Sequence, residues 1–112
     1  MKAMRITMGK GFQMKFPNGV LASVQWGTSN YCENRDLKPE SIGSEHRELV
    51  RTGSYGSDTA EVCAWLEVPE ASFDDRNSII QKLYPGNSDI VIGWMGPADV
   101  VEFLNKCMNY IP

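Results

Sequence analysis

A two-residue alternation of apolar and polar side chains, interrupted only by Leu21, runs through residues 12–16 and 20–26, on either side of a tight-turn motif. Apolar residues occupy every second position from Phe12 to Phe16, and the alternation resumes from Val20 to Trp26. Between the two runs stands Pro17-Asn18-Gly19, which is typical of a turn. This pattern predicts a β-hairpin over residues 11–26 with one face in the core and the other toward water or a partner.

Further strands are predicted on either side of the hairpin. Residues 60–68 alternate in the same way and stop at Pro69, and Ile90, Ile92 and Trp94 continue the pattern nearer the C-terminus. Residues 5–8 form a candidate short strand ahead of a glycine-containing bend, and residues 48–52 form a candidate edge strand. The sheet would then contain five or six antiparallel strands.

Helical signals lie only in the C-terminal half. Ser72-Phe73-Asp74-Asp75 fits a capping box ahead of an apolar run that includes Ile79, Ile80 and Leu83. A second helix is predicted to begin at Pro97, with apolar residues at helical spacing as far as Ile111. Together these patterns predict an α+β fold, in which two helices of the C-terminal half accompany the antiparallel sheet.

Length and composition indicate one globular domain over residues 1–112. Of the 112 residues, 42% are hydrophobic and 22% are charged, which is ordinary for a protein with a packed core. The net charge of −3 and the pI near 5.1 argue against general nucleic-acid binding. No run approaches the roughly 18 apolar residues that span a bilayer, so we expect no membrane association and a cytoplasmic location.

The three cysteines predict free thiols in a reducing compartment. Cys32, Cys63 and Cys107 are odd in number and far apart, and they form no CxxC pair. We therefore expect neither a disulfide framework nor a metal site, and packing explains Cys63 and Cys107.

The long polar stretch from Gly27 to Thr59 is the part of the sequence that points to function, because structureless segments of this length are uncommon inside a compact domain and are either functional or contain structure that the pattern does not reveal. Its rings, amides and guanidinium groups suit a flat, anionic, aromatic ligand such as a nucleotide. The predicted ligand-binding residues are Trp26, Asn30, Tyr31, Arg35, Arg47 and Arg51, with Trp94 as a further stacking residue. Core packing of the rings and surface salt bridges of the arginines remain open as the alternative interpretation.

Catalysis has less support in the sequence. His46 is the only histidine and lies between two charged neighbours, and Cys32 would serve as a nucleophile only if folding brought His46 close to it. The chain has no GxSxG, SxxK, Walker A or HExxH motif. We therefore predict no catalytic residue and no cofactor, with a small hydrolase that uses His46 or Cys32 as an alternative.

Several short segments resemble a family of small phage and prophage proteins. They are Gly9-Lys10-Gly11-Phe12, Phe16-Pro17-Asn18-Gly19, Ser23-Val24-Gln25-Trp26-Gly27, Asn30-Tyr31-Cys32-Glu33-Asn34-Arg35, Ser57-Asp58-Thr59-Ala60-Glu61-Val62 and Gly93-Trp94-Met95. The resemblance implies a viral accessory protein that acts in the cytosol of a host cell.

The layout of a sheet with two helices is also similar to that of the first Thoeris anti-defence family. Proteins of that family bind cyclic ADP-ribose isomers made by TIR-domain enzymes without cleaving them, and they assemble into oligomers. The resemblance implies a homo-oligomer that sequesters a nucleotide-derived immune signal, either such an isomer or a cyclic oligonucleotide. The alternative from another class is an anti-defence inhibitor that acts by protein–protein contact.

Overall fold

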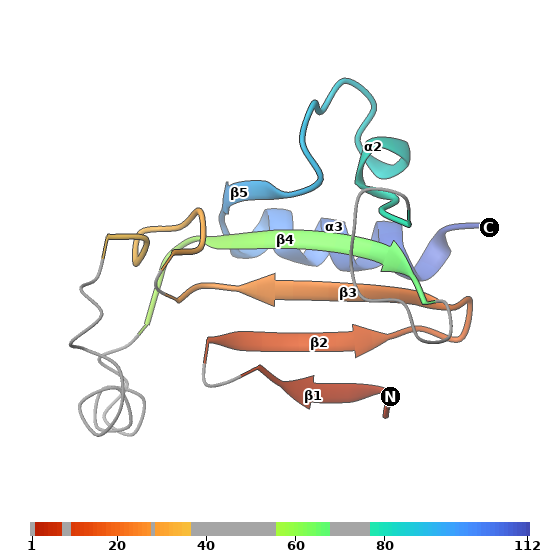
Figure 1. Cartoon of the computed structure of the whole chain (residues 1–112), viewed down its shortest axis with the longest axis horizontal. Coiled ribbons are helices and arrows are strands. Elements are labelled where there is room, and N and C mark those ends of the chain that lie inside the picture. Colours follow the sequence, from red (N-terminus) through yellow and green to blue (C-terminus); the bar gives the residue numbers. More distant parts are fainter. Residues whose placement is uncertain (1, 8–9, 28, 37–55, 68–76) are drawn as a thin grey trace.

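The computed structural model describes residues 2–7, 10–27, 29–36, 56–67 and 77–112. Within these ranges a five-stranded sheet has the order β1-β2-β3-β4-β5, and every neighbouring pair is antiparallel (Figure 1). The strands are β1 (Met4–Ile6), β2 (Gly11–Lys15), β3 (Val20–Gln25), β4 (Ala60–Leu66) and β5 (Ile92–Met95). The helices of the described ranges are α2 (Ile80–Leu83) and α3 (Pro97–Asn109). The predicted α+β fold, with both helices in the C-terminal half, is confirmed.

The hairpin has the register that its alternation predicts. Gly11 lies opposite Gln25, and Lys15 lies opposite Leu21. The backbone amide of Phe16 donates to the carbonyl of Val20 over 2.9 Å, which closes the turn. Gly19 has a φ of 86°, a left-handed conformation that glycine adopts without steric cost.

The core lies between one face of the sheet and the helices. Val20, Ala22 and Val24 of β3 are buried, as are the alternate residues of β4 from Ala60 to Ala64. From α3, Phe103 and Cys107 are fully buried against this face. Figure 1 shows α3 behind the upper part of the sheet, and its contacts are with β3, β4 and β5. Burial of these apolar side chains is the main term that stabilises the fold.

Both ends of α3 are fixed by identifiable residues. The helix begins with Gly96 in an extended conformation and Pro97 in its first turn, where the missing proline N–H leaves no donor unpaired. At the other end, the side-chain amide of Asn18 donates to the carbonyl oxygens of Cys107 and Tyr110, each over 2.9 Å. The turn of the hairpin therefore donates to carbonyl groups at the C-terminal end of the helix, where intrahelical donors run out.

Several element boundaries differ from the sequence prediction. α2 has only four residues, and its N-cap Ile79 makes no side-chain capping hydrogen bond. Ser78 forms an isolated bridge with Trp65 of β4, and α2 begins two residues later at Ile80. The predicted capping-box segment 72–75 lies outside the described residues. β1 ends at Ile6 and β5 begins at Ile92. The candidate edge strand at 48–52 lies outside the described residues.

No helix in the described ranges is long and apolar enough to cross a membrane.

Candidate functional site

A β-bulge in β5 turns Trp94 out of the sheet. Ala60 lies opposite Met95 and Val62 lies opposite Ile92, so β5 passes three residues where β4 passes two. Gly93 and Trp94 both stand opposite Glu61, and Trp94 takes a φ of 59°. This left-handed conformation is rare for a bulky residue because its Cβ crowds the backbone. The bulge leaves the Trp94 side chain 56% exposed.

The loop of residues 29–36 packs directly against this bulge. The backbone amide of Trp94 donates to the carbonyl of Tyr31 over 2.8 Å. Gly93 permits the approach, because a Cβ atom at that position would lie 2.4 Å from the Cβ of Tyr31. The bulged strand and the loop therefore pack against each other at backbone contact distance.

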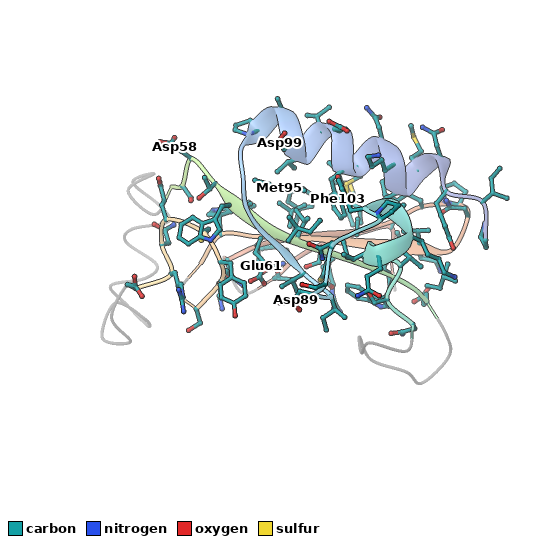
Figure 2. The ribbon with its side chains drawn as sticks, turned by 90° about the horizontal axis from the view of Figure 1, so that it is seen from above. Asp58, Glu61, Asp89, Met95, Asp99 and Phe103 are labelled. Carbon is teal, nitrogen blue, oxygen red and sulfur yellow. The ribbon has the colours of Figure 1, made fainter. Side chains whose placement is uncertain are left out.

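Glu61 of β4 connects the loop to the sheet. Its carboxylate accepts a hydrogen bond from the backbone amide of Tyr31 over 2.9 Å and another from the side-chain amide of Asn30 over 3.4 Å. Because neighbours alternate along a strand, Glu61 points away from the α3 side of the sheet. Figure 2 shows Met95 and Phe103 between α3 and the sheet, with Glu61 on the side away from α3.

The second half of the loop is anchored by side chains of its own. The amide group of Asn34, which is buried, donates to the carbonyls of Trp26 over 2.7 Å and of Gly56 over 3.0 Å. The backbone amide of Glu33 donates to the hydroxyl of Thr59 over 2.9 Å. These bonds anchor the loop to the end of β3 and to the residues that precede β4.

Tyr31 and Arg35 face solvent from this anchored loop. The guanidinium carbon of Arg35 lies 5.3 Å from the centroid of the Tyr31 ring, within the range of a cation–π contact. Tyr31 is 40% exposed. We name the surface formed by Asn30, Tyr31, Arg35 and Trp94 the Tyr31–Trp94 surface. It presents two exposed rings and a guanidinium group on a rigid support.

The seven residues predicted from sequence fall into three groups. Asn30, Tyr31, Arg35 and Trp94 come together as the Tyr31–Trp94 surface, although Trp94 is distant from the others in sequence. Trp26 lies elsewhere: its ring meets Phe12 edge-on at a centroid distance of 6.2 Å and lines a pocket beside α3. Arg47 and Arg51 lie outside the described residues.

Sequence reasoning missed the role of Glu61. Its place in the alternation of β4 marks it only as a polar residue of a strand, and nothing local shows that the loop of residues 29–36 returns to it. The Gly93-Trp94 pair was a partial indication of the bulge in β5, because glycine within a strand is typical of a bulge or of a close backbone approach.

The three thiols have raised pKa values, which disfavours the reactive thiolate form. Burial raises the pKa of Cys32, whose thiol donates to the carbonyl of Gly27 over 3.6 Å. Burial also raises the pKa of Cys63 and of Cys107 to about 12. All three thiols are therefore protonated near neutral pH, and a thiol reacts as the thiolate. His46, the alternative catalytic residue, lies outside the described residues.

Among the described side chains, no group of three or more His, Cys, Asp or Glu residues is placed to hold a metal ion. Comparisons with protein-family models, with curated proteins and with solved structures find no match to this chain. The fold is an antiparallel meander covered on one face by a C-terminal helix, and the Tyr31–Trp94 surface lies at one end of its opposite face.

Proposed function

We propose that this protein is a non-catalytic binding protein that holds a nucleotide-type ligand on the Tyr31–Trp94 surface. The observation that carries the proposal is the left-handed backbone of Trp94, which keeps a large ring exposed where burial would be expected. Backbone strain of this kind is concentrated at functional positions. A neighbouring ring with a guanidinium group above it supplies the rest of the recognition chemistry.

Each group has a defined part in the binding scheme. The rings of Tyr31 and Trp94 stack on the base, which is worth about 1–3 kcal/mol for each stacked base. Arg35 forms charge-assisted hydrogen bonds with phosphate oxygens. Glu61, which already accepts two hydrogen bonds from the loop, has lone pairs left to accept a ribose hydroxyl.

The resemblance of the sequence to small phage proteins extends the proposal to a biological role. The protein would act in the cytosol of an infected bacterium as an anti-defence protein, and it would sequester a cyclic ADP-ribose isomer or a cyclic oligonucleotide that serves as an immune signal. Sequestration requires binding without turnover. The buried, protonated thiols support a binding protein over a thiol hydrolase.

Native mass spectrometry with a panel of cyclic nucleotides and cyclic ADP-ribose isomers tests this function. We expect one of these ligands to bind at a fixed stoichiometry and to be released intact on denaturation. A chemically altered ligand would identify an enzyme. The absence of any adduct would contradict ligand sequestration and would favour inhibition by protein–protein contact.

Substitution of Arg35 tests the location of the site. We expect Arg35→Ala to weaken binding by about 1.5–3 kcal/mol, which is roughly 10- to 150-fold in Kd, while the fold remains intact. Lys82→Ala is the matched control, because Lys82 is an exposed cation on α2. Equal affinity of the Arg35 and Lys82 variants would remove Arg35 from the site.

A further inference from the structure

A pocket lies on the α3 side of the sheet, apart from the Tyr31–Trp94 surface. It is found where the N-terminal end of α3 meets β2, β3 and the start of β4. Its volume of about 360 Å³ is toward the lower end of the range for small-molecule sites. The walls are mainly apolar, and they include Phe12, Val24, Trp26, Met95, Val100 and Val101. The fold therefore contains an apolar pocket of ligand size that the proposed nucleotide site does not use.

Two aromatic rings contribute to the walls of this pocket. Phe12 lies opposite Val24, and Trp26 continues the alternation of β3, so the three side chains share one face of the sheet. Val24 is buried, whereas the rings of Phe12 and Trp26 are only partly buried. The two rings meet at an interplanar angle of 66°. A ligand ring can pack against such a pair in the offset or edge-on arrangements that aromatic groups prefer.

The mouth of the pocket carries a carboxylate. Asp58 lines the pocket and is exposed, and Figure 2 shows it on the α3 side of the sheet. Its backbone amide donates to the carboxylate of Glu33 over 2.8 Å, and the backbone amide of Glu33 donates to the hydroxyl of Thr59 over 2.9 Å. These bonds fix the backbone of Asp58 just before β4 and bring a second carboxylate close to it.

No described residue forms an ion pair with either carboxylate. The described lining of the pocket includes no lysine or arginine. The side chain of Lys10 lies along Gly27, where an added Cβ atom would be 2.7 Å from the Lys10 Cε. Asp99 in the first turn of α3 offsets the partial positive charge at the N-terminus of that helix. The electrostatics of the mouth therefore favour a cation over an anion.

We propose that this pocket binds a small organic cation, in which an ammonium group is attached to an aromatic or branched apolar body. The apolar body fills the pocket beside Phe12 and Trp26, where removal of apolar surface from water stabilises the complex. The ammonium group stays at the mouth and donates a charge-assisted hydrogen bond to Asp58. A neutral ligand of the same shape lacks that bond, and an anion is repelled.

Titration with 2-phenylethylammonium and with 2-phenylethanol tests this pocket, because the two probes share an apolar body and differ in charge. We expect the ammonium to bind several-fold more tightly than the alcohol, measured by calorimetry. Both probes should shift the NMR signals of the Trp26 indole N–H and of the Met95 methyl group. Added salt should weaken binding of the ammonium and leave binding of the alcohol nearly unchanged, since screening acts on charge.

The variant Asp58→Asn separates charge from shape. Asn has nearly the same size, and the printed bond of Asp58 to Glu33 uses only its backbone, so the fold should be retained. We expect this variant to bind the ammonium no more tightly than the alcohol, while its affinity for the alcohol stays the same. Asp89→Asn is the matched control, because Asp89 is exposed and does not line the pocket, and it should keep the full preference.

The variant Val101→Trp tests the location. Val101 is 59% exposed, so a larger side chain should be tolerated while it fills the pocket, and we expect neither probe to bind. Met108→Trp is the matched control on the same helix, because Met108 is 51% exposed and does not line the pocket. Circular dichroism checks that each variant folds. If Val101→Trp does not fold, Asp58→Asn and the NMR shifts decide the location.

Three results would overturn the proposal. They are the failure of both probes to bind the wild-type protein, equal affinity of the wild type for the two probes, and binding that persists in folded Val101→Trp. A preference for the ammonium that is undiminished in Asp58→Asn would also contradict the assigned role of this carboxylate. Nucleotide binding enters none of these measurements, because the Tyr31–Trp94 surface lies on the other face of the sheet.

Discussion

Trp94 combines a backbone conformation that opposes stability with an exposed ring that we propose stacks on the ligand. We expect Trp94→Gly to abolish stacking and weaken ligand binding, while the free energy of unfolding stays the same or rises by about 1 kcal/mol because glycine accepts a positive φ. Urea unfolding and a binding assay measure the two effects. Trp94→Ala is the control, since it removes the ring but keeps the Cβ and should be less stable than Trp94→Gly. A variant Trp94→Gly that is less stable than Trp94→Ala would show that strain is not relieved at this position.

The side-chain hydroxyl of Tyr84 is a buried polar group for which the described residues provide no hydrogen-bond partner. Its hydroxyl oxygen is buried without a hydrogen bond, and burial, followed by the charge of Glu102, raises its pKa to about 12. We expect Tyr84→Phe to leave the free energy of unfolding unchanged or to raise it by up to about 1 kcal/mol, because the desolvation cost of the hydroxyl disappears.

Thermal and urea unfolding test this expectation. Tyr84→Leu is the control, because it also removes the ring that Lys106 approaches to 5.2 Å, and it should be destabilising. A loss of stability of more than about 1 kcal/mol in Tyr84→Phe would show that the hydroxyl has a hydrogen-bond partner in the folded protein.

At the scale of elements, the hairpin turn and the last helix stabilise each other through Asn18. We expect Asn18→Asp to lower the free energy of unfolding by about 1–2 kcal/mol, because the amide donor is lost and a negative charge is placed at the negative end of a helix. Asn109→Asp is the control, since Asn109 is exposed and its amide bonds only within α3. Similar losses in the two variants would show that the contact between the turn and the helix has little energetic value.

The fit between β5 and the loop of residues 29–36 depends on the absence of a side chain at Gly93. We expect Gly93→Ala to displace the loop, to lower the free energy of unfolding by about 1–3 kcal/mol and to weaken ligand binding. Amide chemical shifts of Tyr31 and Trp94 would report the displacement. Gly96→Ala is the matched control, because a Cβ there has no atom within 4 Å. Equal behaviour of the two variants would contradict the close approach.

These elements also show what the sequence could predict and why. The hairpin and the start of α3 depend on contacts between near neighbours, so alternation, turn residues and Pro97 were sufficient. The Asn18 cap depends on residues far away in the chain, and no local pattern encodes it. The bulge at Trp94 also depends on distant partners, and the Gly93-Trp94 pair is only a partial local indication of it. The bridge between Ser78 and Trp65 of β4 is likewise a long-range contact, and α2 begins only after it.

At the scale of the whole molecule, the candidate site was predictable as a set of residue types but not as a location. Tyr31, Arg35 and Trp94 were identified because rings and guanidinium groups suit a nucleotide. Trp26 has the same chemistry, yet its ring packs on the α3 side with Phe12, since it falls on the apolar side of the alternation. Residue type therefore identified the candidate binding residues. The alternation of side chains along a strand decided which face of the sheet each strand residue occupies.

Buried thiols make the stability of the whole protein sensitive to alkaline pH. In the folded state the pKa of Cys63 and of Cys107 is raised to about 12, while an unfolded chain has the ordinary value of 9.0. Above pH 9 the unfolded state therefore binds fewer protons than the folded state. The stability that these groups contribute is fully present below pH 9 and is lost as the pH rises from 9 toward 12. We expect the urea midpoint, measured under reducing conditions, to fall progressively above pH 9.

The variant Cys63→Ala separates the thiols from other causes of alkaline unfolding. It removes one of the two titrating groups, so the slope of the unfolding free energy against pH should become shallower between pH 9 and 11. Ser23, whose hydroxyl interacts with this thiol, provides the control Ser23→Ala, which should keep the slope. Equal slopes in the wild type and in Cys63→Ala would mean that Cys63 ionises as readily in the folded protein as in the unfolded chain.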